Sequence, residues 1–87
     1  MKINYEFVKR KIFNDYYLVP IGEAANKFQG IMAINDVSAF IFDCLPDCSS
    51  AEEIAAKLVE VYDTDSETAL SDTEAFMAVL REQGIID

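Results

Sequence analysis

The sequence predicts an α+β fold in which a three-stranded antiparallel sheet comes first and three helices follow. Two observations support this class. Residues 1–34 contain two runs rich in aromatic and β-branched residues, separated by a turn signal, and then a third short apolar run. After residue 35 the apolar residues recur at helical spacing, in three segments separated by polar breaks. The predicted order of elements is therefore βββααα.

The first two strands are expected to form a hairpin. Residues 7–13 and 16–21 are strand-like, and Asn14 and Asp15 form a turn signal between them. Pro20 should lie near the end of its strand, because it cannot donate a ladder hydrogen bond. The cationic run at residues 9–11 cannot form one nucleic-acid patch, because alternate residues of a strand point to opposite faces.

The third strand is predicted at residues 29–34, after a polar link at residues 22–28. This strand is short and joins the next helix with almost no linker. Nothing later in the chain is suited to pair with its far side. We therefore expect its outer edge to be exposed, with unpaired N–H and C=O groups that an added strand could satisfy.

The first helix is the element around which the chain is organised, and Asn35 and Asp36 are suited to cap it. Its apolar stripe, at i, i+3, i+4, i+7 and i+8, consists of Val37, Phe40, Ile41, Cys44 and Leu45. Ala39 and Phe42 widen the stripe until few polar positions remain. A helix that is apolar on nearly all sides is covered on more than one face, so we expect it in the core.

The second helix is predicted to begin after Ser49 or Ser50, with Glu53 completing a capping box by reaching back to the cap amide. Its apolar face consists of Ala51, Ile54, Ala55, Leu58 and Tyr62. The third helix should run over residues 66–83 and stop at Gly84, a residue type common just after helix ends.

The third helix has an unusually broad apolar arc. In angular order this arc contains Val79, Phe76, Ala69, Leu80, Thr73, Met77 and Leu70. The arc is wider than one small core needs, so we expect one of its edges to line something outside the core. Residues 85–86 are expected to fold back as a tail.

Composition places the chain among ordinary globular proteins. It has 87 residues, of which 52% are hydrophobic and 26% are charged. We expect one domain over residues 1–87, which at this size buries about 60% or more of its unfolded surface. No apolar run approaches the ~18 residues of a membrane span, and no apolar segment follows Met1 and Lys2. We therefore expect a cytoplasmic protein.

The net charge of −9 is unevenly distributed. Residues 1–35 carry five basic and three acidic side chains, whereas residues 36–87 carry two basic and thirteen acidic ones. Binding DNA requires Lys and Arg to neutralise phosphates, yet the last helix has Arg81 as its one cation among several carboxylates. We expect no useful affinity for duplex DNA. A cationic peptide would instead be steered to the acidic half, and added salt should slow its association.

Residues suited to catalysis or metal binding are scarce. The sequence has no His, and its two thiols, Cys44 and Cys48, are too few for a zinc or iron–sulfur site. We expect no metal and no cofactor, with Cys44 in the core and Cys48 in a loop. Asp65 and Ser66 at a helix start superficially suggest an acyl carrier protein. Such carriers attach their prosthetic arm at an Asp-Ser-Leu type of sequence, whereas here Glu67 follows, and the β-rich N-terminal part does not belong to that fold. We expect the chain not to be an enzyme.

Three blocks of the sequence resemble, in matching order, the signature of the PqqD family, named for protein D of pyrroloquinoline quinone biosynthesis. The blocks are residues 34–42 (Ile-Asn-Asp-Val-Ser-Ala-Phe-Ile-Phe), residues 50–58 with 62–63, and residues 72–77 with 80–86. Each block alone is only an amphipathic helix pattern. Their order across nearly the whole chain makes the resemblance specific.

The resemblance implies a winged-helix-like fold and the role of a peptide chaperone, also called a RiPP recognition element (RiPP, ribosomally synthesised and post-translationally modified peptide). Such proteins bind the leader segment of a precursor peptide and present its core to a modifying enzyme, often a radical S-adenosylmethionine (radical SAM) protein. The leader lies as an added strand beside the third strand, against the third helix. The resemblance therefore implies that the edge formed by Leu70, Thr73 and Met77 is an apolar wall beside the third strand. Nothing specific to quinone biosynthesis is visible in the sequence.

We therefore expect a peptide-binding site in two parts. Its residues are Gln29, Gly30, Ile31, Met32, Ala33 and Ile34 in the strand, and Leu70, Thr73, Met77, Leu80 and Arg81 on the last helix. The expected partners are a precursor leader and a modifying enzyme of the radical SAM class, with no nucleic acid and no membrane. The chain is expected to be a monomer or a weak dimer. The alternative is a winged-helix domain that binds a regulatory protein rather than a leader peptide.

Overall fold

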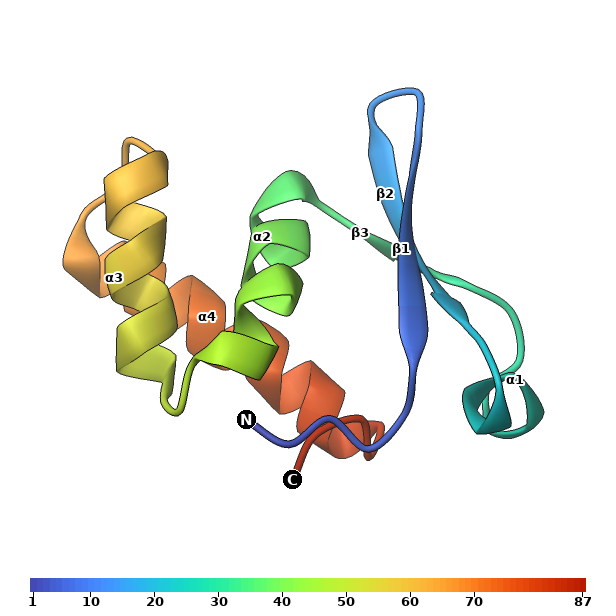
Figure 1. The fold of residues 1–87 in the computed structure, drawn as a ribbon. Coiled ribbons are helices and arrows are strands. Elements are labelled where there is room, and N and C mark those ends of the chain that lie inside the picture. The colour runs from blue at the N-terminus through green and yellow to red at the C-terminus, as the bar shows by residue number, and fades with distance from the viewer.

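The computed structural model describes residues 1–87 and confirms the α+β class, with a three-stranded sheet at the front (Figure 1). The strands are β1 (Phe7–Ile12), β2 (Asp15–Pro20) and β3 (Met32–Ile34), in the sheet order β1-β2-β3, all antiparallel. The helices are α1 (Glu23–Lys27), α2 (Asp36–Cys44), the 3-10 turn η1 (Leu45–Asp47), α3 (Ala51–Val61) and α4 (Ser66–Glu82). The link predicted to be polar and irregular thus contains a short helix, α1. No helix is long and apolar enough to cross a membrane.

The sheet lies on one side of the molecule and the helices α2, α3 and α4 on the other, with α2 between the sheet and α3 (Figure 1). The β1–β2 hairpin projects beyond the helical body. The two ends of the chain lie together, joined by an isolated bridge between Ile3 and Ile86 and by a hydrogen bond from Asn4 N–H to Ile85 C=O at 2.7 Å. These contacts close the side of the core below α2.

The β1–β2 loop consists of Phe13 and Asn14, one residue earlier than the predicted turn. Pro20 pairs at the outer end of the ladder, as predicted from its missing N–H. Phe13 has a positive φ of 56°, which is uncommon for any residue other than glycine.

The cationic run of β1 is divided between the two faces of the sheet. The ammonium groups of Lys9 and Lys11 each lie 5.5 Å from the centroid of the Tyr16 ring. Arg10, between them, belongs to the opposite face because side chains alternate along a strand. The prediction that these residues form no single cluster is confirmed.

The core is one cluster in which α2, α3 and α4 meet β2. Its 13 buried residues are Leu18, Ile41, Leu45, Cys48, Ile54, Ala55, Leu58, Ala69, Phe76, Met77, Leu80, Ile85 and Ile86. Ile41 of the central helix is fully buried, as are Leu18 of β2 and Ile85 of the tail. Each fully buried side chain of this size stabilises the fold by about 1.5–3 kcal/mol. The predicted central helix and folded-back tail are therefore both confirmed.

α2 and α3 begin at their predicted caps, and α4 begins at the predicted residue with Asp65 as a cap that the sequence analysis did not name. The cap side chains accept backbone N–H groups in the pairs Asn35–Ser38 at 2.7 Å, Ser50–Glu53 at 3.2 Å and Asp65–Thr68 at 2.7 Å. The capping box differs from expectation in one contact. The Glu53 carboxylate accepts a hydrogen bond from the Ser49 hydroxyl at 2.8 Å rather than reaching back to the cap amide. A cap acts through its immediate neighbours in sequence, so these helix starts were predictable.

The burial of the two thiols differs from the prediction. Cys44 packs against the core as predicted, but it is partly exposed. Cys48 lies in a loop as predicted, in the irregular segment after η1, but it is 2% exposed and belongs to the core. The reason is η1, which turns the chain after α2 and returns Cys48 to the core before α3 begins. Burial raises the pKa of the Cys44 thiol, and the neighbouring Cys48 raises it further. No group of three or more His, Cys, Asp or Glu side chains is placed to hold a metal ion.

We predict that the Asp65 cap makes stability depend on pH. Hydrogen bonds from Thr68 lower the pKa of the Asp65 carboxyl, so the folded protein takes up this proton less readily than the unfolded chain. The stabilisation is present above the unfolded pKa of about 3.9 and is lost as pH falls through the folded value. Asp65→Asn keeps an accepting oxygen that does not titrate.

The melting temperature of wild type should therefore exceed that of Asp65→Asn at neutral pH, and the difference should shrink between about pH 5 and about pH 3. Thermal unfolding followed by circular dichroism measures it. A difference that stays constant over this interval would contradict the role of the charged cap.

Candidate functional site

β3 forms an open edge of the sheet, since its one neighbour is β2. This confirms the predicted exposed edge, although the strand spans three residues rather than residues 29–34. The preceding Gln29, Gly30 and Ile31 are irregular, and Gly30 has a positive φ of 82°. An open edge presents unpaired backbone groups to solvent.

The register of β1 and β2 determines which way the backbone groups of β2 point. The Ile21 N–H donates to the Glu6 C=O at 3.1 Å, one step beyond the end of the ladder. Hydrogen-bonded pairs recur at every second residue of an antiparallel ladder, so the odd-numbered residues of β2 face β1. The even-numbered residues, Tyr16 and Leu18, therefore face β3.

The same alternation determines which way the backbone N–H and C=O groups of β3 point. Tyr16 pairs with Ile34, and Leu18 pairs with Met32. Ile34 and Met32 therefore direct their N–H and C=O groups toward β2, and the intervening Ala33 directs its own to the open edge. The Ala33 side chain is also exposed. Ala33 is thus the residue of β3 that is free to pair with another strand.

Two cavities lie at the two ends of β3. One, of about 360 Å³, is lined by Asn35, Val37, Ser38, Asp72, Ala75, Phe76 and Val79. The other, of about 380 Å³, is lined by Phe7, Leu18, Lys27, Phe28, Gln29, Gly30, Ile31, Met32 and Gln83. The first adjoins the residues that follow β3, and the second contains the residues that precede it. An extended chain beside β3 would run from one cavity to the other.

One side of α4 and its cap runs from the first cavity to the second, and we call it the α4 stripe. Its residues in the first cavity are Asp72, Ala75, Phe76 and Val79, and the cap residue Gln83 lines the second. They share one side of the helix at a spacing of three and four residues. Val79 is 44% exposed, whereas Phe76 is 8% exposed and anchors the stripe to the core. The stripe is apolar in its middle and polar at its two ends.

The wall predicted from Leu70, Thr73 and Met77 does not lie beside β3. Thr73 and Met77 are 0% and 2% exposed, and Leu80 is 0% exposed, so these three side chains belong to the core. The Leu70 edge of the apolar arc packs against α3, whereas the Val79 edge lines the cavity next to Asn35, the residue that follows β3.

The open edge of β3 and the two cavities at its ends together form what we call the groove. Two further predicted residues lie away from this groove. Leu70 lines a separate cavity between α3 and α4, together with Ala55 and Ala56. Arg81 donates through Nε to the Asp87 C=O at 3.0 Å. The sequence reasoning missed the α4 stripe, although Val79 stood at the opposite end of the same arc and was the available signal.

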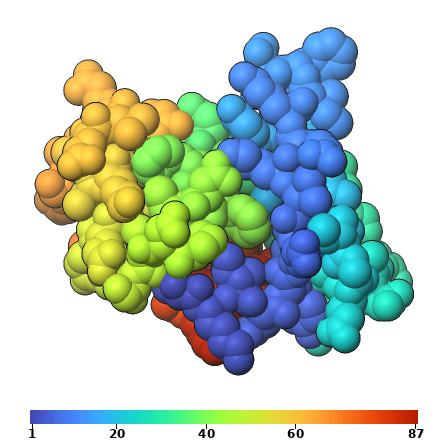
Figure 2. Space-filling model, viewed as in Figure 1, coloured from blue at the N-terminus to red at the C-terminus, as the bar shows by residue number.

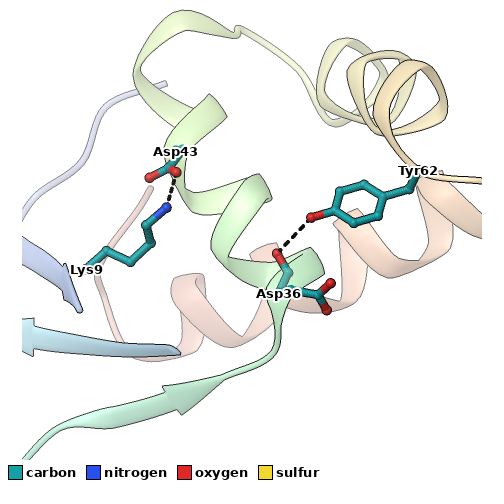
Figure 3. A network of polar contacts seen from close by, with 4 residues as sticks. All are labelled: Lys9, Asp36, Asp43 and Tyr62. Atoms are coloured by element: carbon teal, nitrogen blue, oxygen red, sulfur yellow. Dashed lines mark hydrogen bonds and ion pairs between the residues drawn. The ribbon is translucent and has the colours of Figure 1, made fainter. Parts of the chain in front are cut away.

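Polar contacts hold α2 at both of its ends (Figure 3). Lys9 of β1 forms an ion pair with Asp43 near the end of α2. At the start of α2, the Tyr62 hydroxyl donates to the Asp36 C=O at 3.4 Å, and the Tyr62 ring packs edge-on against Phe40 with centroids 5.6 Å apart. Burial raises the pKa of Tyr62, as does the charge of Asp36, so the hydroxyl remains a donor at neutral pH. These contacts fix the side of the groove that α2 supplies.

An open sheet edge beside a helix face with an apolar centre defines a class of protein. Domains with this geometry take up an extended peptide as an additional strand. Main-chain hydrogen bonds along the edge contribute affinity, and cavities for alternate side chains contribute selectivity. The fold and the groove therefore define a domain suited to strand addition.

The sequence matches the profile of the family described as Coenzyme PQQ synthesis protein D (PqqD) over residues 18–86. This match spans most of the chain, and the chain belongs to the PqqD family. No curated protein matches the sequence at a significant level.

Two solved structures share the fold. One is TbiB1 in complex with the TbiA(β) leader peptide, with a TM-score of 0.72 and 21% identity over 100% of this chain and 95% of that one. The other is lasso peptide synthetase B1 complexed with the leader peptide, with a TM-score of 0.69 and 21% identity over 97% of this chain and 93% of that one. The arrangement of three antiparallel strands and helices is common to all three.

The two sides of α4 should respond differently to a carboxylate. Met77 is 2% exposed, and burying an unpaired charge there costs several kcal/mol, comparable with the ~5–15 kcal/mol that stabilises a typical domain. Met77→Asp should therefore unfold the protein. Val79 is 44% exposed, so Val79→Asp should leave the fold intact. Circular dichroism measures both variants, and a folded Met77→Asp or an unfolded Val79→Asp would show that the faces of α4 are wrongly assigned.

Proposed function

We propose that this chain is a peptide chaperone that binds the leader segment of a ribosomally synthesised precursor peptide as an added strand on β3. The observation that carries the proposal is the position of the outward-facing Ala33 backbone between two cavities that share the α4 stripe. Membership of the PqqD family supports it. So does the likeness to two structures that each contain a leader peptide.

Backbone pairing alone would bind a leader weakly. Ala33 offers one N–H and one C=O, and each hydrogen bond contributes about 0.5–1.5 kcal/mol net. A dissociation constant of 1 μM requires about 8 kcal/mol. Apolar leader side chains seated in the two cavities, each contributing about 1.5–3 kcal/mol, would therefore supply most of the affinity. The Ala33 edge would set the register of the leader.

The charge of the chain favours a leader with cationic residues. Asp72 lies at one end of the α4 stripe and is exposed, and Asp36 begins α2 next to the groove. The residues from 36 onward carry thirteen acidic and two basic side chains. Such a field raises the association rate of a cationic peptide more than it changes its final affinity.

In the proposed function the bound leader presents the rest of its precursor to a modifying enzyme. The chain itself, as one domain over residues 1–87, would supply binding and orientation and no catalytic group. The family resemblance favours an enzyme of the radical SAM class.

Ala33→Pro tests strand addition most simply. Proline removes the outward N–H of residue 33 and leaves the bonds of Met32 and Ile34 to β2 in place. We expect leader affinity to fall at least tenfold while circular dichroism still shows a folded domain. The titration uses a fluorescent synthetic peptide with the sequence of a candidate precursor leader.

Ala33→Thr is the matched control, because threonine keeps the N–H and suits a strand. It should bind the leader like wild type. Undiminished binding by Ala33→Pro would exclude pairing at this edge. Equal loss in both variants would indicate a side-chain contact at position 33 instead of a backbone one.

A further inference from the structure

The tip of the β1–β2 hairpin carries the most exposed large apolar side chain of the chain. Phe13 is 92% exposed and its neighbour Ile12 is 50% exposed. Neither packs against the core cluster, and Phe13 takes part in none of the aromatic pairs. Figure 2 shows the tip standing clear of the helical body. Neither side chain therefore contributes to the core.

The backbone at the tip is also in an uncommon conformation. Phe13 has a φ of 56°, which is an outlier for a bulky residue, whereas Asn or Gly would adopt it more readily. Residues held at such angles cluster at ligand clamps and other functional positions. The two-residue turn itself favours a positive φ, but it does not call for an aromatic side chain, so the exposed ring is the feature that a contact with another molecule would explain.

The charges beside the tip indicate the chemistry of that molecule. Arg10 and Lys11 are exposed and form no salt bridge, since Lys9 with Asp43 is the one ion pair of the structure. Asp15 is the one carboxylate at the tip, so the cations are in excess there. An apolar pocket with a carboxylate rim would complement this protrusion.

The position of the tip relative to the groove indicates which protein carries that pocket. Tyr16, directly after the tip, pairs with Ile34 at the end of β3, and Asn35 beyond it lines the first cavity. The tip therefore lies beyond the Ile34 end of β3, where an added strand would have one of its two ends. A protein held at the tip would meet the leader-bound precursor at that end.

We propose that the hairpin tip, formed by Ile12 and Phe13 with Arg10, which lies on the same face of the strand as Ile12, is the docking site for the modifying enzyme that acts on the leader-bound precursor. This inference rests on the proposed function. A second copy of the chain fits less well as the partner. A two-fold contact between two tips would bring Arg10 of one copy against Arg10 of the other. A tip inserted into another copy's groove would be a head-to-tail contact, which does not form a closed dimer. A nucleic acid is disfavoured by the net charge of −9.

The experiment titrates the full chain against a recombinant candidate modifying enzyme of the radical SAM class, with saturating synthetic leader present. Phe13→Asn removes the ring and suits the positive φ, so the fold should be retained. Arg10→Glu reverses the neighbouring charge. We expect each variant to weaken enzyme binding at least tenfold while leader affinity stays within twofold of wild type.

Matched controls lie on α3, where Val61 is 62% exposed and Lys57 is an exposed cation. Val61→Asn and Lys57→Glu should bind the enzyme like wild type. The inference is overturned if the tip variants keep full enzyme affinity, or if the controls lose as much. It is also overturned if sedimentation shows that Phe13→Asn abolishes self-association, or if an RNA oligonucleotide binds wild type and not Arg10→Glu. Failure of wild type to bind the leader would instead overturn the proposed function.

Discussion

The burial of α2 is the constraint on which the rest of the structure depends. Ile41 is fully buried and Ala39 is 2% exposed, and the helix is enclosed by the sheet on one side and by α3 and α4 on the other. Because α2 begins at Asp36, two residues after β3 ends, seating this helix also fixes where β3 lies. The edge strand is held beside α4 with its outer side open. The groove is therefore a consequence of packing the core.

α4 serves the core and the groove with different sides of one helix. Thr73, Met77 and Leu80 are buried, whereas Val79 is 44% exposed beside the first cavity. Phe76, at 8% exposure, joins the two sides. Interiors are packed at nearly crystalline density, so the position of the exposed stripe is set by side chains that never reach the groove. A rigid wall of this kind lowers the conformational entropy lost when a peptide binds.

Local signals in the sequence predicted the helix starts and the hairpin. Asn35, Ser50 and Asp65 act on amides three residues away, so no knowledge of tertiary structure was needed. The open edge of β3 was also predictable, since the chain offers no further strand to cover it.

The orientation of α4 and the burial of the thiols were not predictable in this way. Helical periodicity gave an arc from Val79 to Leu70, but it could not say which end α3 would cover. Cys48 followed a proline and resembled a loop thiol, and only the direction of η1 returns it to the core. α1 was missed because its five residues are too few for a periodic pattern. The orientation of α4 and the burial of Cys48 depend on contacts between segments distant in the sequence.

Hydrogen exchange at single backbone amides, followed by NMR, tests the central claim most directly. In the free protein the amides of Met32 and Ile34 should exchange slowly, because they pair with β2, and the amide of Ala33 should exchange fast. Adding saturating leader peptide should slow exchange at Ala33 and leave the exposed residues of α3 unchanged. Protection of Ala33 before any leader is added, or unchanged exchange there at saturation, would contradict strand addition at this edge.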